Sequence, residues 1–379
     1  MTGFVFHYGP RLLSGPARAT RIGELVSARH VLVVTDAQVR ALALADAMLD
    51  ALRSDGCTVT IFDAVEADPS RSTLEAAVEA GRGAEAVIGF GGGSPMDVAK
   101  LAAYLLGSGD DLDAIWGVGN ARGTGLPLIL IPTTAGTGSE ATPVAIISLP
   151  GGEKRGVSSP ALIAHHAVLD PTLTLGLPRH VTAATGIDAM VHAIEAYTSA
   201  HLKNPVSDML AKEALGLLSG HLLRACATPD DIEARGAMLL GAHLAGVAFS
   251  NAPVGGVHAL AYPLGGRFHV PHGLSNALML PHVLGHNMQA AMPLYAELAP
   301  IIDPSLAPLG GQARAQGLVE ALRALSVAAG MPQRLREVGI GAEHLETLAA
   351  DAMLQERLLR NNPRPIELAD ARRLYEAAL

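Results

Sequence analysis

The chain has 379 residues, which is long enough for two domains. Its net charge of −9 argues against a nucleic-acid partner, because contacts with phosphates need a positive surface. With 49% hydrophobic and 17% charged residues the chain is able to bury a sizeable core, so we expect a folded globular protein. Two cysteines, Cys57 and Cys226, are too few for a disulfide framework, and the first residues lack the features of a signal peptide. Both observations favour the cytoplasm.

The first half of the chain alternates short apolar runs with amphipathic stretches. We expect strands at 31–35, 58–62, 86–90 and 126–132, and helices at 38–54, 70–82 and 95–106. Because the strands are continuously apolar, both of their faces should be covered. The pattern therefore predicts a parallel sheet in an α/β domain, which we place at residues 1–178.

The second half shows helical periodicity with little strand signal. Helices are expected at 183–200, 206–226, 231–249 and 274–290, and again through the tail 311–379, with breaks near 330–332 and 362–363. We therefore expect an all-α domain over residues 179–379.

One uncharged stretch, residues 236–266, is long enough on its own to suggest a membrane span. It also holds prolines, many glycines and polar side chains, which are costly to place in lipid. We expect instead a buried helix that leads into a glycine-rich turn, and no membrane partner.

A glycine-rich segment, 91–97 (GGGSPMD), joins an expected strand to an expected helix. Backbone N–H groups at such a helix start suit a pyrophosphate, with Ser94 as the helix cap and Pro95 in the first turn. The alternative is an ordinary tight turn with a capping box of Ser94 and Asp97. The GxGxxG fingerprint is absent.

A second loop, 132–140 (PTTAGTGSE), is dense in hydroxyls and follows another apolar strand. Its alternative interpretation is a plain polar loop, but two such loops in one domain favour a nucleotide bound across them. Asp36, at the end of the first expected strand, would accept hydrogen bonds from ribose hydroxyls and repel a 2′-phosphate, which favours NAD over NADP. Asp36 is equally suited to cap the following helix.

A second set of residues has the chemistry of metal ligands. Asp188 and His192 are four residues apart, so they share one helix face and are able to chelate a divalent metal. On spacing alone, a capping box of Thr185 with Asp188 beside a core histidine is the stronger interpretation. His258 lies in the uncharged stretch, where an unpaired imidazole would be costly to bury.

His272, in a Pro-His-Gly sequence, completes a set of three imidazoles and one carboxylate. Such a set suits Fe(II), Zn or Co. His282 and His286 are also four residues apart, so spacing does not exclude a metal site built on them.

Taken together, these segments resemble the iron-containing (group III) alcohol dehydrogenase family. The resemblance spans nearly the whole chain, and the segments that carry it occur in the family's order: GFGGGSPMDVAK (89–100), PTTAGTGSE (132–140), ATGIDAMVHAIEAY (184–197), AFSNAPVGGVHALAYPLGG (248–266) and VPHGLSNALMLPHV (270–283). It implies a dehydroquinate synthase-like fold, with a dinucleotide-binding α/β domain followed by a helical metal-binding domain.

The resemblance also implies the site residues and cofactors. The cofactors would be NAD and a divalent metal, with Fe(II) expected and Zn as the alternative. The implied metal ligands are Asp188, His192, His258 and His272. The candidate cofactor contacts are Asp36, Gly92, Gly93, Ser94, Asp97, Thr133, Thr134, Thr137 and Lys154. Lys154 would bond to the nicotinamide ribose, and its alternative is a solvated surface lysine. The candidate catalytic residues are His258, Tyr262 and His272.

The chain departs from the family's commonest pattern at two positions. Tyr262 stands where many members have a histidine four residues after the third ligand, and its reference pKa near 10 makes it a poorer base at neutral pH. The proton route through Tyr262, or through the cofactor ribose and water, therefore stays open. Asp68 stands where many members have Asn, and we expect only a local change in cofactor contacts.

The resulting prediction is a metal-dependent oxidoreductase that transfers hydride between a small alcohol, or its aldehyde or ketone, and NAD(H). The metal would act as a Lewis acid on the substrate oxygen. An oxo-acid reductase of the maleylacetate type would need cationic anchors, yet Arg267 is the one charged residue between 236 and 281. A non-catalytic binding protein that keeps the fold is the other alternative. We expect a homodimer or larger homo-oligomer. Apolar candidates for the pocket lining are Phe249, Tyr262, Phe268 and Leu358.

Overall fold

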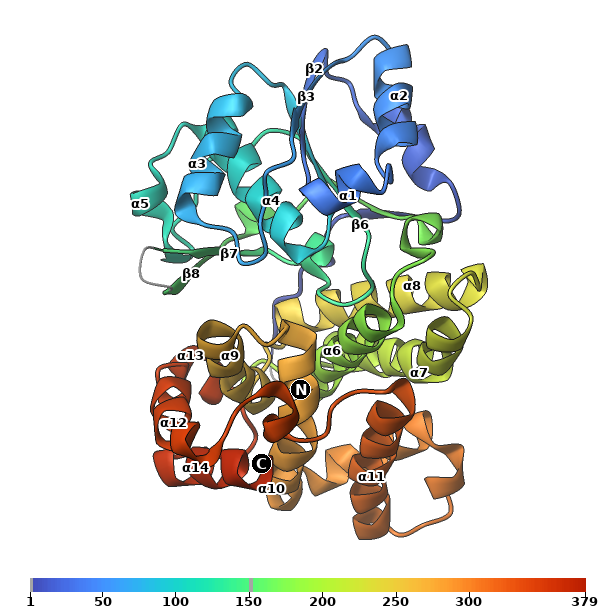
Figure 1. The fold of residues 1–379 in the computed structure, drawn as a ribbon, viewed down its shortest axis with the longest axis vertical. Helices are drawn as coiled ribbons and strands as arrows, with labels where there is room; N and C mark the ends of the chain where they lie inside the picture. Colours follow the sequence, from blue (N-terminus) through green and yellow to red (C-terminus); the bar gives the residue numbers. More distant parts are fainter. Residues whose placement is uncertain (1–2, 150–152) are drawn as a thin grey trace. The chain divides into compact units, whose positions relative to one another are not determined.

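The computed structural model describes residues 3–149 and 153–379, which pack as two compact units (Figure 1). One unit is Tyr8–Leu175, and the other combines Met1–His7 with Gly176–Leu379. The sequence-based prediction was an NAD-binding domain at 1–178 and a metal-binding domain at 179–379. That assignment stays a prediction here, because the units are defined by packing alone.

The unit Tyr8–Leu175 is built on a parallel sheet. Among the described residues its strand order is β1-β9-β6-β4-β2-β3, and every neighbouring pair is parallel. The strands are β1 Arg11–Ser14, β2 His30–Val34, β3 Thr58–Phe62, β4 Ala86–Gly91, β6 Leu128–Pro132 and β9 His166–Leu169.

Both faces of this sheet are covered, as the apolar runs predict. Leu32 and Val34 of β2 pack on one face, in the same cluster as residues of α3 (Arg71–Ala80) and α4 (Gly93–Ser108). Val31 and Val33 belong to the cluster on the other face, with residues of α2 (Asp46–Ser54). Figure 1 shows these helices on opposite sides of the strands. The α/β prediction is confirmed.

The remaining elements of this unit are short. A smaller sheet has the order β5-β8-β7, with β7 and β8 antiparallel. Its strands are β5 Gly117–Val118, β7 Val144–Ser148 and β8 Lys154–Ser158, and α5 spans Leu112–Ile115. The 3-10 helices here are η1 Arg18–Leu25, η2 Ser139–Ala141, η3 Pro160–Leu162 and η4 Pro171–Thr174.

The expected helix 38–54 is wrong in one respect, because the structure divides it into two. α1 spans Ala37–Ala41 and α2 begins at Asp46. Between them Ala43 has a φ of 55°, in the left-handed region, which a right-handed helix cannot continue through. Apolar spacing carries no signal for that local backbone choice.

The unit that contains Gly176–Leu379 is helical, as predicted. Its helices are α6 Arg179–Thr198, α7 Pro205–Ala227, α8 Ile232–Asn251, α9 Gly256–Phe268, α10 His272–Ile302, α11 Gly311–Ala329, α12 Leu345–Met353, α13 Glu356–Leu359 and α14 Leu368–Ala377. Short 3-10 segments are η5 Pro304–Leu306, η6 Leu335–Val338 and η7 Ala342–His344. Residues 186–198 of α6 are all buried, so α6 runs through the core of this unit.

The expected buried helix is α8, which ends at Asn251 and leads into a break at 252–255 that contains Gly255. The turn does not extend to residue 266, because α9 occupies that stretch. Pro263, Gly265 and Gly266 lie inside the helix. Their unfavourable propensity is outweighed by the burial of the apolar residues 257, 260, 261 and 264 against the rest of the unit. α10 also extends past its expected end, because its buried face continues to residue 299.

No single helix among the described residues is long and apolar enough to cross a membrane. α8 and α9 meet the length and composition criteria only as a pair, and that pair is bent by 107°.

Candidate functional site

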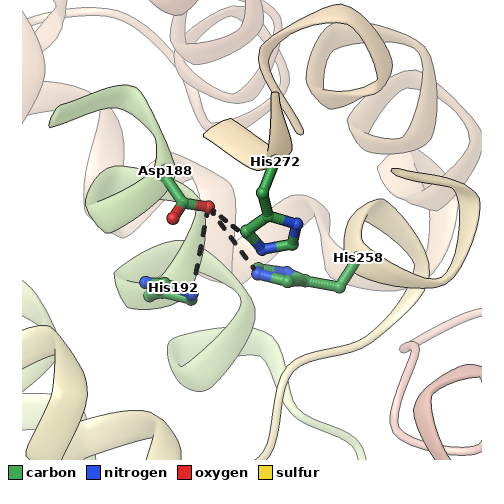
Figure 2. Close-up of side chains that lie close together, drawn as sticks. All are labelled: Asp188, His192, His258 and His272. Atoms are coloured by element: carbon green, nitrogen blue, oxygen red, sulfur yellow. Dashed lines mark ion pairs between the residues drawn. The ribbon is translucent and has the colours of Figure 1, made fainter. Parts of the chain in front are cut away.

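Four polar side chains from three helices meet inside the helical unit. Asp188 and His192 come from α6, His258 comes from α9, and His272 is the first residue of α10 (Figure 2). One donor atom of each lies within 4.8 Å of the others. Asp188 Oδ1 is 3.9 Å from His192 Nε2, 3.9 Å from His258 Nε2 and 3.7 Å from His272 Nε2. Ligands of a tetrahedral metal with bonds of about 2.1 Å lie about 3.4 Å apart, so a small inward shift would complete such a site.

The local fold of α6 explains why Asp188 and His192 point into this group. The helix begins at Arg179, well before Thr185, whose hydroxyl donates to the carbonyl of Val181 at 2.9 Å. The capping box of Thr185 with Asp188 is therefore wrong, because neither residue lies in the first turn. At a spacing of four residues, Asp188 and His192 project from one buried face.

Gly273 lets α10 approach α6 closely. A Cβ added there would lie 2.3 Å from the carbonyl oxygen of Ala184 and 3.3 Å from Cβ of Asp188. Any side chain would therefore separate the two helices at the turn that carries Asp188. Because His272 precedes Gly273, this close contact also brings its imidazole to the carboxylate.

The group is mostly buried. Asp188, His192 and His258 are each at most 5% exposed, whereas the His272 side chain is 42% exposed, so the site opens to solvent at His272. Burial by itself would raise the pKa of Asp188, but the imidazoles of His192, His272 and His258 outweigh it and the pKa lies below its ordinary value. The carboxylate is thus kept in the deprotonated form that metal binding requires.

His282 and His286 are not part of this group. Nε2 of His286 bonds to the carbonyl oxygen of Pro365 at 3.0 Å. Burial, with the charge of Arg323 adding to it, lowers the pKa of His282 to about 4. The helical spacing of these two histidines therefore has a structural explanation apart from the metal-ligand group.

In the α/β unit, the three predicted nucleotide segments follow neighbouring strands. Asp36 follows β2, the glycine loop follows β4, and the loop from Thr133 follows β6; these strands are adjacent in the order β6-β4-β2. Since the strands are parallel, their carboxyl ends share one edge of the sheet, where nucleotides bind in folds of this kind.

The glycine loop starts α4 differently from what the sequence suggests. Gly92 is the N-cap, and Ser94 lies inside the helix. The predicted Ser94 cap and its capping box are wrong, because the helix begins two residues earlier than expected, with Gly92 as an N-cap that has no side chain. The first N–H groups of α4 therefore remain available as anion donors.

The second loop packs directly against the first. A Cβ on Gly92 would lie 3.8 Å from Oγ1 of Thr134, and one on Gly93 would lie 3.1 Å from Cγ2 of Thr137. Thr133 is buried at the end of β6. The structure thus brings the two predicted loops together.

Asp97 and Lys100 hold the second loop in place. The Asp97 carboxylate accepts from the Ser139 hydroxyl at 2.6 Å and from the Ile146 amide at 3.0 Å. Lys100 is fully buried, and its ammonium donates to Ser139 Oγ and to the Val144 carbonyl, each at 2.7 Å. Asp97, expected to contact the cofactor, thus has a positioning role in this structure. Sequence reasoning missed Lys100.

Asp36 caps the helix that follows it. Its Oδ1 accepts from the Val39 amide at 2.8 Å, so the capping interpretation is confirmed. Its Oδ2 would lie 3.3 Å from a Cβ on Gly91, so the second oxygen lies beside the glycine loop. The contact of Asp36 with a ribose stays a prediction.

Lys154 forms an ion pair with Asp68 at 2.6 Å. Asp68 stands where many family members have Asn, and its carboxylate contacts Lys154, a predicted cofactor residue. Lys154 is exposed, and its pair with Asp68 lies at the surface, as expected for a solvated surface lysine.

Of the expected pocket residues, two lie beside the four-residue group. The ring of Phe249 stacks on His192 with centroids 4.5 Å apart, and Tyr262 lies 5.7 Å from the ring of His272. Phe268 instead packs on His344, and Leu358 is 5% exposed on α13. Leu358 is therefore core in this structure.

The comparisons with known proteins agree with this picture. The model described as "Iron-containing alcohol dehydrogenase" matches residues 9–171, and that described as "Fe-containing alcohol dehydrogenase family, C-terminal" matches residues 182–379. The chain belongs to the iron-containing alcohol dehydrogenase family. It is an oxidoreductase that acts on alcohols, so the family prediction is confirmed and the alternative functions are not favoured.

Individual relatives cover nearly the whole chain. It is 43% identical over 358 residues to Long-chain-alcohol dehydrogenase 1 of Geobacillus thermodenitrificans, covering 93% of this chain and 90% of that protein. It is 32% identical to NAD-dependent methanol dehydrogenase of Bacillus methanolicus, covering 99% of each. The solved structure of a 1,3-propanediol oxidoreductase matches with a TM-score of 0.95 at 32% identity, covering 99% of this chain and 100% of that one.

Two further residues contact the four-residue group, and the sequence analysis did not identify either of them. Asn276 of α10 donates through Nδ2 to Asp188 Oδ1 at 2.5 Å, and its Oδ1 is buried without a hydrogen-bond partner among the described residues. Glu195 of α6 contacts His258. The signal for Glu195 was its position seven residues after Asp188 and three after His192, on the same face of α6.

Gly273→Ala should destabilise the protein by about 1–3 kcal/mol, because the new methyl group meets backbone atoms that cannot move aside cheaply. Urea denaturation would measure the change in the free energy of unfolding. Gly285→Ala is the matched control, since it lies in the same helix with nothing within 4 Å of its Cβ position. That control should gain stability by about 0.5–1 kcal/mol from helix propensity. Equal stability of the two variants would contradict the close-contact argument.

Proposed function

We propose that this chain is an NAD-dependent, metal-dependent alcohol dehydrogenase whose metal is held by Asp188, His192, His258 and His272. The observation that carries the proposal is the convergence of their four donor atoms in one largely buried group. Three imidazole nitrogens and one carboxylate oxygen form a borderline donor set that suits Fe(II), our proposed metal, with Zn as the alternative. The low pKa of Asp188 supports a carboxylate that is ready to bind a cation.

The metal would supply Lewis-acid polarisation of the substrate oxygen. The aromatic faces of Phe249 and Tyr262, beside His192 and His272, favour an apolar substrate chain next to that oxygen. The charge pattern agrees, because Arg267 is paired with Asp351 and is not available to anchor a carboxylate substrate. We therefore propose an uncharged alcohol, or its aldehyde or ketone, as the substrate.

NAD, when bound, would take up the hydride from the carbinol carbon. The N–H groups at the start of α4 would bind its pyrophosphate, and the loop residues Thr133, Thr134 and Thr137 would line the same site. Asp36 Oδ2 would accept from a ribose hydroxyl, and Lys154 would bond to the nicotinamide ribose while paired with Asp68. Support for NAD also comes from the relative named an NAD-dependent methanol dehydrogenase. A cytoplasmic homodimer or larger homo-oligomer stays our expectation.

Removing the metal should abolish NAD-linked alcohol oxidation, and adding Fe(II) or Zn should restore it. Metal analysis should find about one ion per chain, and Asp188→Asn or His192→Ala should lower that content by more than about tenfold. His286→Ala is the control, because His286 lies outside the ligand group and should leave metal content unchanged. The proposal fails if no metal form turns over any member of an alcohol and aldehyde panel.

Asp36→Asn should raise kcat/KM for NADP relative to NAD by about tenfold, because it removes the charge that repels a 2′-phosphate. Asn is as good an N-cap as Asp, so the start of α1 should be preserved. Steady-state kinetics with both cofactors would measure the ratio, with Asp50→Asn on α2 as a control for the loss of one surface charge. An unchanged ratio would place the ribose recognition elsewhere.

Tyr262→Phe should lower kcat by about tenfold if the Tyr262 hydroxyl carries the proton away from the alcohol. This loss is below the about 10²–10⁴-fold of a sole acid–base group, because a route through ribose and water remains. Tyr262→His introduces the residue that many family members have at this position, and it should keep the rate. Full activity of Tyr262→Phe across pH would remove Tyr262 from the proton route.

A further inference from the structure

Glu195 is a buried carboxylate that the proposed reaction does not use directly. It lies on α6, seven residues after Asp188, and is 5% exposed. Its Oε1 accepts from the backbone N–H of Val257 at 2.6 Å, and its Oε2 lies 2.6 Å from Nδ1 of His258. Val257 is in the first turn of α9, where backbone N–H groups have no partner within the helix. One carboxylate thus holds both the start of α9 and the imidazole that α9 carries.

These two contacts decide which nitrogen of His258 carries the proton. A backbone N–H can only donate, and an ionised carboxylate can only accept, so Glu195 is an acceptor toward both partners. Nδ1 of His258 is therefore the protonated nitrogen. In the neutral ring Nε2 then keeps its lone pair, and it is Nε2 that lies 3.9 Å from Asp188 Oδ1 in the ligand group.

Both carboxylate oxygens of Glu195 contact residues of α9. Two of the polar side chains nearby, Asn287 and Asn362, bond to each other through both amides at 2.8 and 2.7 Å. Asn362 also accepts from the N–H of Gly256, next to Val257. The start of α9 is therefore fixed by two separate side chains, and the imidazole that follows has little freedom to turn.

We propose that Glu195 is a positioning residue for the metal centre, which sets the tautomer and the orientation of His258 so that Nε2 faces the metal. This inference rests on the proposed function, since it assumes that the four-residue group binds a metal. Carboxylates bonded to the outer nitrogen of a ligand histidine commonly act in this way, and their loss weakens metal binding about 10–100-fold.

Glu195→Gln is the most informative variant. Its amide has the same shape as the carboxylate, but it offers one acceptor and one donor in place of two acceptors. If the amide oxygen meets the Val257 N–H, the amide nitrogen donates to Nδ1 of His258. The ring proton then moves to Nε2, and the ligand lone pair is lost. If the amide is reversed, its nitrogen faces the Val257 N–H and two donors oppose each other in a buried site. Neither arrangement reproduces the pattern of the carboxylate.

The experiment measures the affinity of the metal-free full chain for Zn²⁺, by competition with a chromophoric chelator. We expect Glu195→Gln to bind Zn²⁺ about 10–100-fold more weakly than the unaltered protein. The control is Glu297→Gln, which makes the same chemical change on α10, where Glu297 bonds to Tyr197 and Lys212. It should bind Zn²⁺ within about twofold of the unaltered protein.

A second readout follows the tautomer itself. In the metal-free protein with ¹⁵N-labelled histidine, the His258 signal, assigned by its absence in His258→Ala, should show Nδ1 protonated and Nε2 bare. This measurement needs no variant at Glu195, so it remains decisive if Glu195→Gln does not fold. A bare Nδ1 would overturn the proposal.

The outcomes distinguish the role of Glu195 from the proposed metal site itself. If the unaltered protein binds Zn²⁺ and Glu195→Gln binds it equally well, the role of Glu195 is wrong and the metal site stands. If the unaltered protein binds neither Zn²⁺ nor Fe(II), the proposed function is wrong, and the role of Glu195 toward a metal falls with it. Weaker binding by Glu195→Gln together with a protonated Nδ1 supports the proposal.

Discussion

The close contact between α6 and α10 is the constraint on which the candidate metal site depends. Gly273 allows the helices to meet at Ala184, and that contact brings His272 to Asp188. The cost is a set of polar atoms packed in a core, where unpaired charges and donors are unfavourable. The structure meets this cost with specific partners: the Asn276 amide for Asp188, and the start of α9 for Glu195.

The cost of burying polar groups also shapes the α/β unit. A fully buried ammonium at Lys100 is tolerated because Ser139 and the Val144 carbonyl accept its hydrogen bonds. Those bonds hold the second loop beside the first, so the buried lysine stabilises the two predicted nucleotide-binding loops. Burial of Lys100 lowers its pKa, because desolvation disfavours the charged form.

The sequence allowed the architecture to be predicted where burial leaves a periodic trace. Continuous apolar strands indicated a sheet covered on both faces, and helical periodicity indicated the second unit. Periodicity failed at Ala43, whose left-handed backbone has no composition signal, and at α9, where packing outweighs Pro263 and two glycines. The proposed metal ligands were inferred from family resemblance, because the spacing of Asp188 and His192 alone favoured a capping box.

Glu195 and Asn276 escaped prediction for a different reason, since each acts through a partner that is distant in sequence. A carboxylate on the same helix face as Asp188 looks like a further ligand until the position of the Val257 N–H is known. The two carboxylates of α6 are chemically alike, but Asp188 faces imidazole nitrogens, whereas Glu195 faces two donors of α9. Their donors and acceptors, rather than their residue type or spacing, assign one to the ligand group and the other to its support.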